Sequence, residues 1–460
     1  MDFNQNAIQL RNYLGVKPEK KGLTHNINKF APFFPFPTRN PERAKFARGF
    51  EGVVGEFSRL LSNQSINDKL DLDEVVNKIS EKVEINSEDK PYFKSLIKHY
   101  LLDQNSSMKI FHPYIFKYLQ KTDGDEGKGE SEIALFLRDI YSRENEKIKA
   151  LFEKTESEHV MAKLILENLD YLEDKEKISK YTGKLEHISN VFYEDFLFIT
   201  KHTEYFTEHF ELFLAYYYFF YITQLSLKLS QRQNANYSEV NELFYTLDWE
   251  GTNKSRSSQI KGYNLIKESA KNLLVHSNTL EQINIIQGTK GLSYPELINN
   301  FESLSISDKT ELENEITNWI KEYADLMEIE LVENYSIEYV SLIFKLFAMI
   351  EEVHTKIQTK QGTKSRYSLS VEQIGKKYFL KSRGSFGYML NMSQDLLLLL
   401  SAVVIKDHKK SLKDVFKGLE DRGVYFDRYS KEAIVELFDK LNLLDKKSDS
   451  GDAQYVKPIL

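Results

Sequence analysis

Residues 210–229 read FELFLAYYYFFYITQLSLKL, and this stretch decides what kind of protein the chain is. It is the most membrane-like segment of the sequence, yet it carries Glu211, Gln224, Lys228 and four tyrosines within six positions. Placing those groups against lipid would cost heavily, whereas a protein core can supply their hydrogen-bond partners. We therefore expect a buried helix of a soluble protein. The aromatic run at 213–221 is then core packing, with a docking groove for a partner as the alternative.

The sequence on both sides of this stretch is also typical of helices. Apolar residues recur at three- and four-residue steps through 131–231. Further helices are expected at 305–331, with Ser307 as the N-cap, and at 335–357. The glycine-rich polar stretch 121–130 predicts a mobile surface loop.

Composition and charge narrow the class of protein. The chain has 460 residues, 41% of them apolar and 28% charged, which predicts a folded protein of more than one domain. The absence of cysteine excludes disulfides and thiolate metal sites and favours the cytoplasm. Residues 1–50 hold nine Lys and Arg against three Asp and Glu, and residues 376–460 hold 16 against 12. Residues 51–375 hold 37 Lys and Arg against 54 Asp and Glu. The chain therefore has an acidic middle between two basic ends, and the basic ends can contact phosphate.

Proline and charge patterns divide the chain into segments. Residues 30–37 place three prolines among four phenylalanines, which predicts an extended arm that lies on its own body or on a partner. The predicted fold class is mainly α, a multi-helix body with a C-terminal winged helix-turn-helix domain. The predicted segments are an extended, basic, Pro- and Phe-rich arm at 1–50, an acidic all-helical body at 51–357 with a sub-boundary near 235–260 left open, a basic linker and strand segment at 358–390, and the winged helix at 391–460.

The last segment is the most informative one. A first helix begins at Ser393, and a second opens with a capping pattern of Ser411 and Asp414 and stops at Gly423. Ser430 is expected to cap a third helix. A strand, a glycine-bearing turn and another strand complete the chain. Three helices followed by a β-hairpin predict a winged helix-turn-helix.

This module suggests contact with DNA. The third helix would enter the major groove, and cations at its start and on the wing would face phosphates. Acidic residues on the wing oppose that contact, so docking on protein stays open. Residues 376–388 mix bases, glycines and aromatics, a composition that can hold phosphates and stack on bases; an ordinary strand and turn is the alternative. The predicted DNA-binding residues are Arg428, Lys431, Lys446 and Lys447 in the module and Lys376, Lys377, Lys381 and Arg383 upstream of it.

Searches for catalytic motifs are negative. The glycines around Lys128 lack the spacing of a phosphate-binding loop, and His202 and His209 lack the further ligands that a metal site needs. Glu173 and Lys175 form an E-x-K pattern of metal-dependent nucleases, but they fall in a charged run that predicts an exposed helix. We expect no catalytic residue, cofactor or metal; a cryptic metal-dependent nuclease is kept as an alternative.

The C-terminal motifs resemble a known family. The stretches RGVYFDRYSKE (422–432) and KSDSGDAQYV (447–456) look like the C-terminus of the DNA phosphorothioation-dependent restriction protein DptG, and 376–395 and 213–228 are also similar. The resemblance implies a subunit of a bacterial defence complex with an ATPase-like subunit and a helicase- or nuclease-type ATPase. Such a complex acts on DNA that lacks backbone sulfur and spares phosphorothioated DNA. The family offers no catalytic residues to carry over.

The resulting expectation is a cytoplasmic, non-catalytic subunit that engages duplex DNA or connects the partner subunits, without membrane contact. A pure scaffold whose winged helix docks on those subunits is the main rival. A transcription factor is disfavoured because no heptad seam supplies a symmetric dimer.

Overall fold

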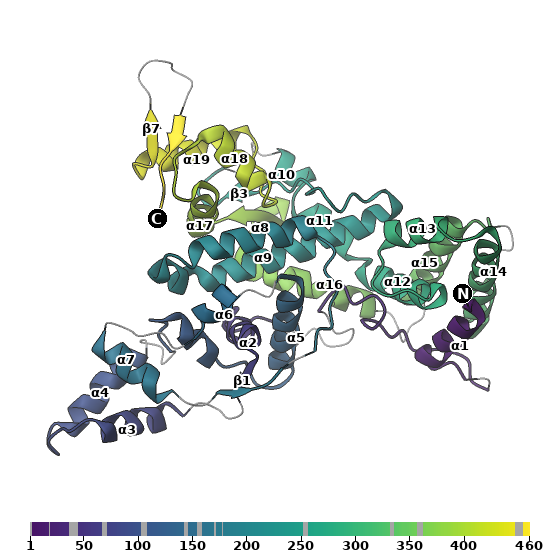
Figure 1. The fold of residues 1–460 in the computed structure, drawn as a ribbon. Coiled ribbons are helices and arrows are strands. Elements are labelled where there is room, and N and C mark those ends of the chain that lie inside the picture. The colour runs from purple at the N-terminus through teal and green to yellow at the C-terminus, as the bar shows by residue number, and fades with distance from the viewer. Residues whose placement is uncertain are drawn as a thin grey trace.

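The computed structural model confirms the mainly helical class, and helices gather around α9 (Thr203–Gln231) near the centre of the molecule (Figure 1). One hydrophobic core contains residues from Phe3 to Val456, and a smaller second core lies in a projecting lobe. The structure describes residues 2–17, 19–35, 45–66, 71–102, 108–141, 146–153, 159–169, 172–176, 178–251, 256–331, 335–356, 362–446 and 454–460.

Helix α9 is buried on all sides over most of its length. The side chains from Phe213 to Tyr221 are at most 2% exposed, so the aromatic run is core and not a docking groove. Two of its buried polar side chains have partners within the protein: Gln224 exchanges two hydrogen bonds with the Asn241 backbone, and Lys228 Nζ donates to Asn241 Oδ1 at 2.8 Å. Those bonds offset the cost of burying polar groups. Within the described residues, no helix combines the length and apolar character needed to cross a bilayer.

Helices α2 and α5 pack beneath α9 at close range. Two glycines of α2 allow it to approach α5 and the segment before α5. A Cβ on Gly52 would come within 2.2 Å of the Glu130 carboxylate, and one on Gly55 within 2.3 Å of the Leu119 carbonyl oxygen. The predicted mobile loop at 121–130 is wrong from Gly124 onward, because α5 begins there and buries Glu130. The elements of this layer are α2 (Glu51–Leu61), η2 (Pro113–Tyr118), α5 (Gly124–Tyr141), α6 (Glu146–Leu151) and α8 (Glu186–Ile199).

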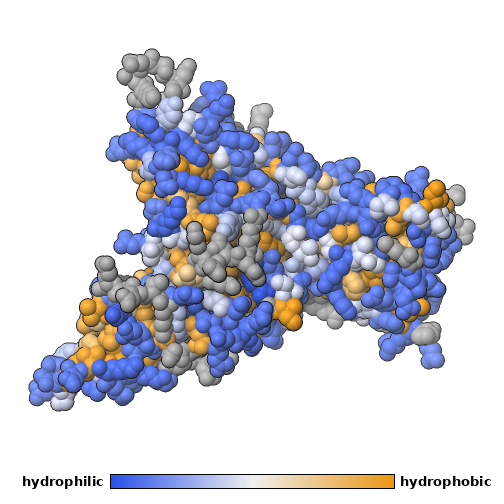
Figure 2. All heavy atoms as spheres, in the orientation of Figure 1, coloured by the Kyte–Doolittle hydropathy of each residue, from blue (hydrophilic) through white to orange (hydrophobic). Residues whose placement is uncertain are grey.

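A small lobe projects from this layer and has its own core. Figure 2 shows apolar atoms gathering on its surface, where Tyr92, Leu96 and Val160 are exposed. The predicted helix at Glu173 is wrong: residues 172–174 form a strand that pairs with residues 64–66. The lobe and its base comprise α3 (Leu72–Lys82), α4 (Lys90–Leu101), α7 (Val160–Asn168), β1 (Gln64–Ile66) and β2 (Leu172–Asp174).

The N-terminal segment is folded onto a helical group at the other end of the molecule. The prediction of an extended arm is wrong for residues 3–14, which form a helix capped by Asp2 and stopped at Gly15. The arm does lie on its own body, because Ala31, Phe33 and Phe34 are buried. The helices of this group are α1 (Phe3–Leu14), α12 (Leu273–Gln287), α13 (Tyr294–Glu302), α14 (Ile306–Met327), whose N-cap is Ser305 and not the predicted Ser307, and α15 (Tyr339–Lys356).

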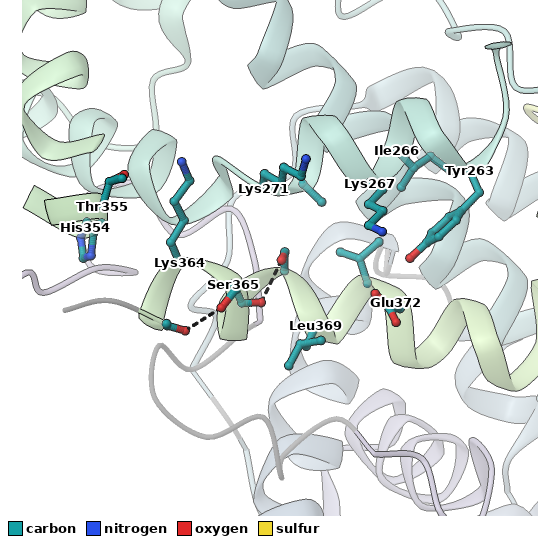
Figure 3. Close-up of a pocket in the computed structure, with 14 residues that line it drawn as sticks. Tyr263, Ile266, Lys267, Lys271, His354, Thr355, Lys364, Ser365, Leu369 and Glu372 are labelled. Atoms are coloured by element: carbon teal, nitrogen blue, oxygen red, sulfur yellow. Dashed lines mark hydrogen bonds between the residues drawn. The ribbon is translucent and has the colours of Figure 1, made fainter. Parts of the chain in front are cut away.

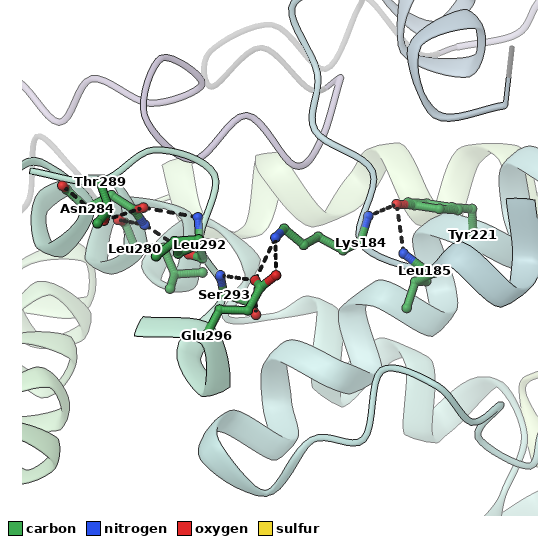
Figure 4. A network of polar contacts seen from close by, with 9 residues as sticks. All are labelled: Lys184, Leu185, Tyr221, Leu280, Asn284, Thr289, Leu292, Ser293 and Glu296. Atoms are coloured by element: carbon green, nitrogen blue, oxygen red, sulfur yellow. Dashed lines mark hydrogen bonds and ion pairs between the residues drawn. The ribbon is translucent and has the colours of Figure 1, made fainter. Parts of the chain in front are cut away.

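A polar network joins this group to the centre of the molecule (Figure 4). The Lys184 backbone N–H donates to the Tyr221 hydroxyl of α9 at 2.6 Å, and its Nζ contacts the Glu296 carboxylate of α13 at 2.6 Å. Glu296 also accepts from the Ser293 backbone N–H at 2.7 Å, which completes the capping box of α13. Lys184, just before α8, thus contacts α9 through its backbone and α13 through its side chain.

The remaining elements lie along α9 and beyond it. The predicted linker at 358–390 contains a helix and a π-helical turn before its strand, because Tyr367, Val371 and Ile374 pack into the core. A parallel pairing of β3 with β5 and an antiparallel pairing of β4 with β5 form one sheet. Its elements and their neighbours are η3 (Arg232–Asn234), β3 (Thr246–Leu247), α10 (Arg256–Ile260), α11 (Tyr263–Ala270), α16 (Thr363–Ile374), η5 (Gly375–Phe379), β4 (Leu380–Ser382), η6 (Gly384–Phe386) and β5 (Tyr388–Met392).

The chain ends in three helices and a small sheet with strand order β6-β8-β7. The predicted first helix is confirmed and has Ser393 as its N-cap, and the predicted cap Ser411 and the left-handed stop at Gly423 are confirmed. The third helix is capped by Asp427 and not by Ser430. The elements are α17 (Gln394–Ile405), β6 (Lys410–Ser411), α18 (Leu412–Glu420), α19 (Arg428–Lys440), β7 (Leu444–Lys446) and β8 (Gln454–Val456).

Candidate nucleic-acid interface

The predicted cations upstream of the last module lie on η5, β4 and the turn after it. Lys376 pairs with Glu372 and its Nζ lies 4.8 Å from the centre of the Tyr388 ring. Lys377 Nζ contacts the Ala47 carbonyl oxygen at 3.4 Å and has no acidic partner among the described residues. Both side chains are exposed, which leaves them accessible to a polyanion.

Lys381 and Arg383 are held by the end of β3. Lys381 Nζ pairs with Asp248 Oδ1 at 2.7 Å. Arg383 Nη2 donates to the Leu247 carbonyl oxygen at 2.7 Å and to Asn391 Oδ1 at 3.0 Å. Burial alone would raise the pKa of Asp248, but the hydrogen bonds from Lys381 and Asn391 hold it below its usual value. Arg383 therefore has a structural role, which the sequence did not indicate.

Two of the four predicted cations of the last module, Arg428 and Lys431, lie at the start of α19. Arg428 Nε pairs with Glu432 at 2.8 Å and is 87% exposed, so it can exchange this partner for a phosphate. Lys431 Nζ lies 3.3 Å from Glu420 and 5.0 Å from the centre of the Phe416 ring. Lys446 ends β7, with its side chain outside the described part of the chain, and Lys447 lies outside that part altogether.

The turn at residues 248–250 lies between Arg383 and the start of α19. Tyr245 and Tyr425 are joined by a backbone hydrogen bond of 2.9 Å, which places the end of β3 beside the start of α19. Glu250 lies within electrostatic range of Arg383 on one side and of Asp427 and Ser430 on the other. Burial raises the pKa of the Glu250 carboxyl, and the neighbouring Ser430 opposes that shift.

Exposed aromatic side chains accompany these cations. Phe386 and Tyr388 belong to the stretch 376–388 that was expected to stack on bases, whereas Trp249 and Tyr429 were not assigned to the site. These side chains belong to the same turn, to η6 and β5 and to the first turn of α19, and flat exposed rings are suitable for stacking on bases. The aromatic residues are Trp249 (42% exposed), Phe386 (41%), Tyr388 (40%) and Tyr429 (51%). We call these four residues with Lys376, Lys377, Lys381, Arg428 and Lys431 the cationic-aromatic surface.

Replacing Glu250 with Gln is expected to stabilise the protein at neutral pH. Because its pKa is raised in the folded state, the ionised carboxylate disfavours folding, and this cost grows as pH rises above the unfolded pKa. The gain should be about 1 kcal/mol, because both carboxylate oxygens are shielded from solvent although the residue as a whole is partly exposed. Thermal denaturation at pH 4 and pH 7 measures it. The Glu250→Gln variant should unfold at the same temperature as the parent at pH 4 and at a higher temperature at pH 7. The control Glu436→Gln, on the exposed face of α19, should unfold at the same temperature as the parent at both pH values.

A second cationic region lies between α8 and the last module and was missed in the sequence. It is a cleft of about 570 Å³ lined by Lys406, Lys409, Lys410 and Lys417. Carboxylates of the same chain neutralise most of these cations, as Asp445 does for Lys409 at 2.9 Å. The five lysines within residues 406–417 are the feature of the sequence from which this cationic region could have been predicted.

The candidate metal and catalytic groups do not form a site. Across the ranges that the structure describes, no three His, Asp or Glu side chains converge as metal ligands would. His209 stacks on Tyr205 with ring centres 4.0 Å apart, and His202 packs against Phe198. Glu173 lies on a two-stranded ribbon opposite Ser65, not in a cluster of carboxylates. No protein-family model matches this chain, and no curated protein matches it either.

Proposed function

We propose that this chain is a non-catalytic, DNA-engaging adaptor subunit of a phosphorothioation-dependent restriction complex. The observation that carries the DNA part is the cationic-aromatic surface, where cations and stacking rings from distant segments meet around the 248–250 turn. Phosphate contacts position a duplex, and exposed rings accommodate unstacked bases. The restriction role, the ATPase-type partner subunits and the cytoplasmic location follow from the family resemblance of residues 422–432 and 447–456.

The proposal includes a winged helix at the end of the chain. The order helix, short strand, helix, helix and two strands, with the last strand in the middle of the sheet, supports it. The third helix, α19, would be the recognition helix, and Arg428 and Lys431 lie in its first turn. The helix start also attracts phosphate through the helix dipole.

Two sets of alanine substitutions test the DNA part. One set changes Arg428, Lys431, Lys446 and Lys447, and the other changes Lys376, Lys377 and Lys381; Arg383 is kept because it holds β3. Each set should weaken binding to a fluorescent duplex and lower the slope of log affinity against log salt by about 0.9 for every phosphate that the variant no longer neutralises. A phosphorothioated duplex of the same sequence reports whether this subunit distinguishes sulfur.

The control carries alanine at four lysines that are also paired with carboxylates of this chain but lie elsewhere: Lys78, Lys98, Lys128 and Lys356. It should bind DNA with the slope of the parent. Equal affinity and slope in all variants would exclude this surface as the DNA site. Removing residues 390–460 is not a usable test, because the cut falls inside β5 and removes buried residues of the main core.

A pure scaffold is the second candidate, and one observation favours it. Carboxylates of the chain itself already pair with Arg428, Lys431, Lys376 and Lys381, and a phosphate would have to displace them. A scaffold predicts no salt-dependent DNA binding by the purified chain and a stable complex with the partner subunits. The duplex titration above separates the two candidates.

A further inference from the structure

A pocket of about 480 Å³ opens between α11, the end of α15 and α16. It borders the cationic-aromatic surface, because Glu372 of its lining pairs with Lys376. Figure 3 shows it as an elongated cavity, with His354, Thr355 and Lys364 toward one end and Tyr263 and Glu372 toward the other. Lys267 and Lys271 project from the α11 side between these ends. Its volume lies in the range of small-molecule sites, roughly 300–1,000 Å³.

The lysines give the pocket a positive charge. Lys271 pairs with Glu268 at 2.6 Å, and Lys364 pairs with Glu351 at 2.8 Å; neither of these carboxylates lines the cavity. Lys267 has no acidic partner in the part of the chain that the structure describes. An anionic group placed beside Lys267, Lys271 and Lys364 would therefore gain charge-assisted hydrogen bonds.

The rest of the lining is suited to a flat apolar group. The apolar residues of the lining are Ile266, Ala270, Leu369 and Val371. Leu369 is the partly exposed one, and the other three are at most 3% exposed and lie behind the surface of the cavity. At the end of the pocket formed by Tyr263 and Glu372, burial raises the pKa of the Tyr263 hydroxyl. The charge of Glu372 and the hydrogen bond between Tyr263 and Glu372 raise this pKa further. Glu372 is about one-quarter exposed, so its carboxylate can accept a further hydrogen bond, for example from an amino group on a heteroaromatic ring.

From this arrangement we propose that the pocket binds a mononucleotide. The phosphate lies between Lys271 and Lys364, with Lys267 beside it, and the base lies against the partly exposed Leu369. The edge of the base faces Glu372, which favours adenine and cytosine, whose exocyclic amino groups donate a hydrogen bond, over uracil. The inference does not rest on DNA binding by the chain, although Glu372 also pairs with Lys376 of the cationic-aromatic surface.

Isothermal titration of the full-length protein with AMP, CMP, UMP, adenosine and inorganic phosphate tests the inference. AMP and CMP should bind more tightly than UMP, and adenosine and phosphate alone should bind weakly or not at all. The Lys267→Ala, Lys271→Ala double variant should weaken AMP binding about tenfold, as expected for two solvent-screened charge contacts. Ser368→Phe, which places a ring inside the cavity, should abolish binding.

Lys321→Ala, on the exposed face of α14, is the matched control and should bind AMP as the parent does. Each variant should keep the thermal midpoint of the parent, which shows that the fold is intact. Absence of AMP binding by the parent overturns the proposal. AMP binding that Ser368→Phe leaves intact overturns it as well, because the nucleotide then binds elsewhere. Binding of decanoate but not of AMP would assign the pocket to aliphatic anions instead.

Discussion

Asp195→Asn should destabilise the protein by about 3–5 kcal/mol, the range expected when one partner of a buried ion pair is removed. Arg422 Nε and Nη2 donate to the two oxygens of Asp195 at 2.6 and 2.5 Å, and the Tyr217 hydroxyl donates to the same carboxylate. Asp195 is fully buried and the Arg422 side chain is 9% exposed. Burial alone would lower the pKa of Arg422, but Asp195 raises it above its usual value, so the arginine stays charged. Asparagine would leave that charge buried without its counter-ion.

This pair attaches the last module to the body, since Asp195 belongs to α8 and Arg422 follows α18. Hydrogen exchange should therefore show opening of residues 393–460 in the variant, together with a lower unfolding midpoint. Asp421→Asn is the control: its pair with Lys417 is exposed on the same module and should be worth less than about 1 kcal/mol. The double change Asp195→Leu with Arg422→Met should recover much of the stability, because it leaves no buried charge. Equal effects of Asp195→Asn and Asp421→Asn would contradict this account.

Glu281→Gln should release the N-terminal segment and destabilise the fold by at least about 3 kcal/mol, as expected for several hydrogen bonds to a buried charge. One oxygen of Glu281 accepts from the backbone N–H groups of Lys29 and Phe30 at 2.9 and 2.8 Å and from the Tyr13 hydroxyl at 2.7 Å. The other oxygen accepts from the Ala31 N–H at 2.7 Å. The glutamine amide presents a donor in place of one acceptor, so at least one buried N–H is left without an acceptor.

Limited proteolysis within residues 19–35 should become faster in Glu281→Gln, and the unfolding midpoint in urea should fall. Glu322→Gln is the matched control. Glu322 also holds the N-terminal segment, through Arg11 at 2.7 Å, but both side chains are about one-third exposed. Glu322→Gln should destabilise the protein only slightly, because water replaces the partly exposed contact between Glu322 and Arg11. If Glu322→Gln released the segment as readily as Glu281→Gln, the buried carboxylate would not be the anchor.

The candidate interface was partly visible in the sequence. Basic residues are the groups that contact phosphate, so Lys376 and Arg428 could be named from residue type and position. Their partners Glu372 and Glu432 lie one helical turn away in sequence, a spacing that signals such pairs but was not used in the prediction. The role of Trp249 could not be predicted, because only the pairing of β3 with β5 and of Tyr245 with Tyr425 places its turn between the two groups of cations.

Local features of the fold follow from the sequence by itself. The buried helix expected at 210–229, the helix expected to begin at Ser393, the cap Ser411, the stop at Gly423 and the final strand pair were predicted correctly. Each depends on hydrophobic periodicity or on hydrogen bonds between residues a few positions apart, which the order of residues records directly.

Other features were decided by tertiary structure. Residues 3–14 form a helix because one of its faces packs into the core. The first turn of α5 contains Gly127, where the Thr122 carbonyl leaves no room for a Cβ, and residues 172–174 form a strand because residues 64–66 pair with them. The strongest polar contacts join positions 227 and 250 residues apart, Arg422 with Asp195 and Ala31 with Glu281. A buried charge is stable only where the folded chain brings its partner to it, and no local pattern records that partner.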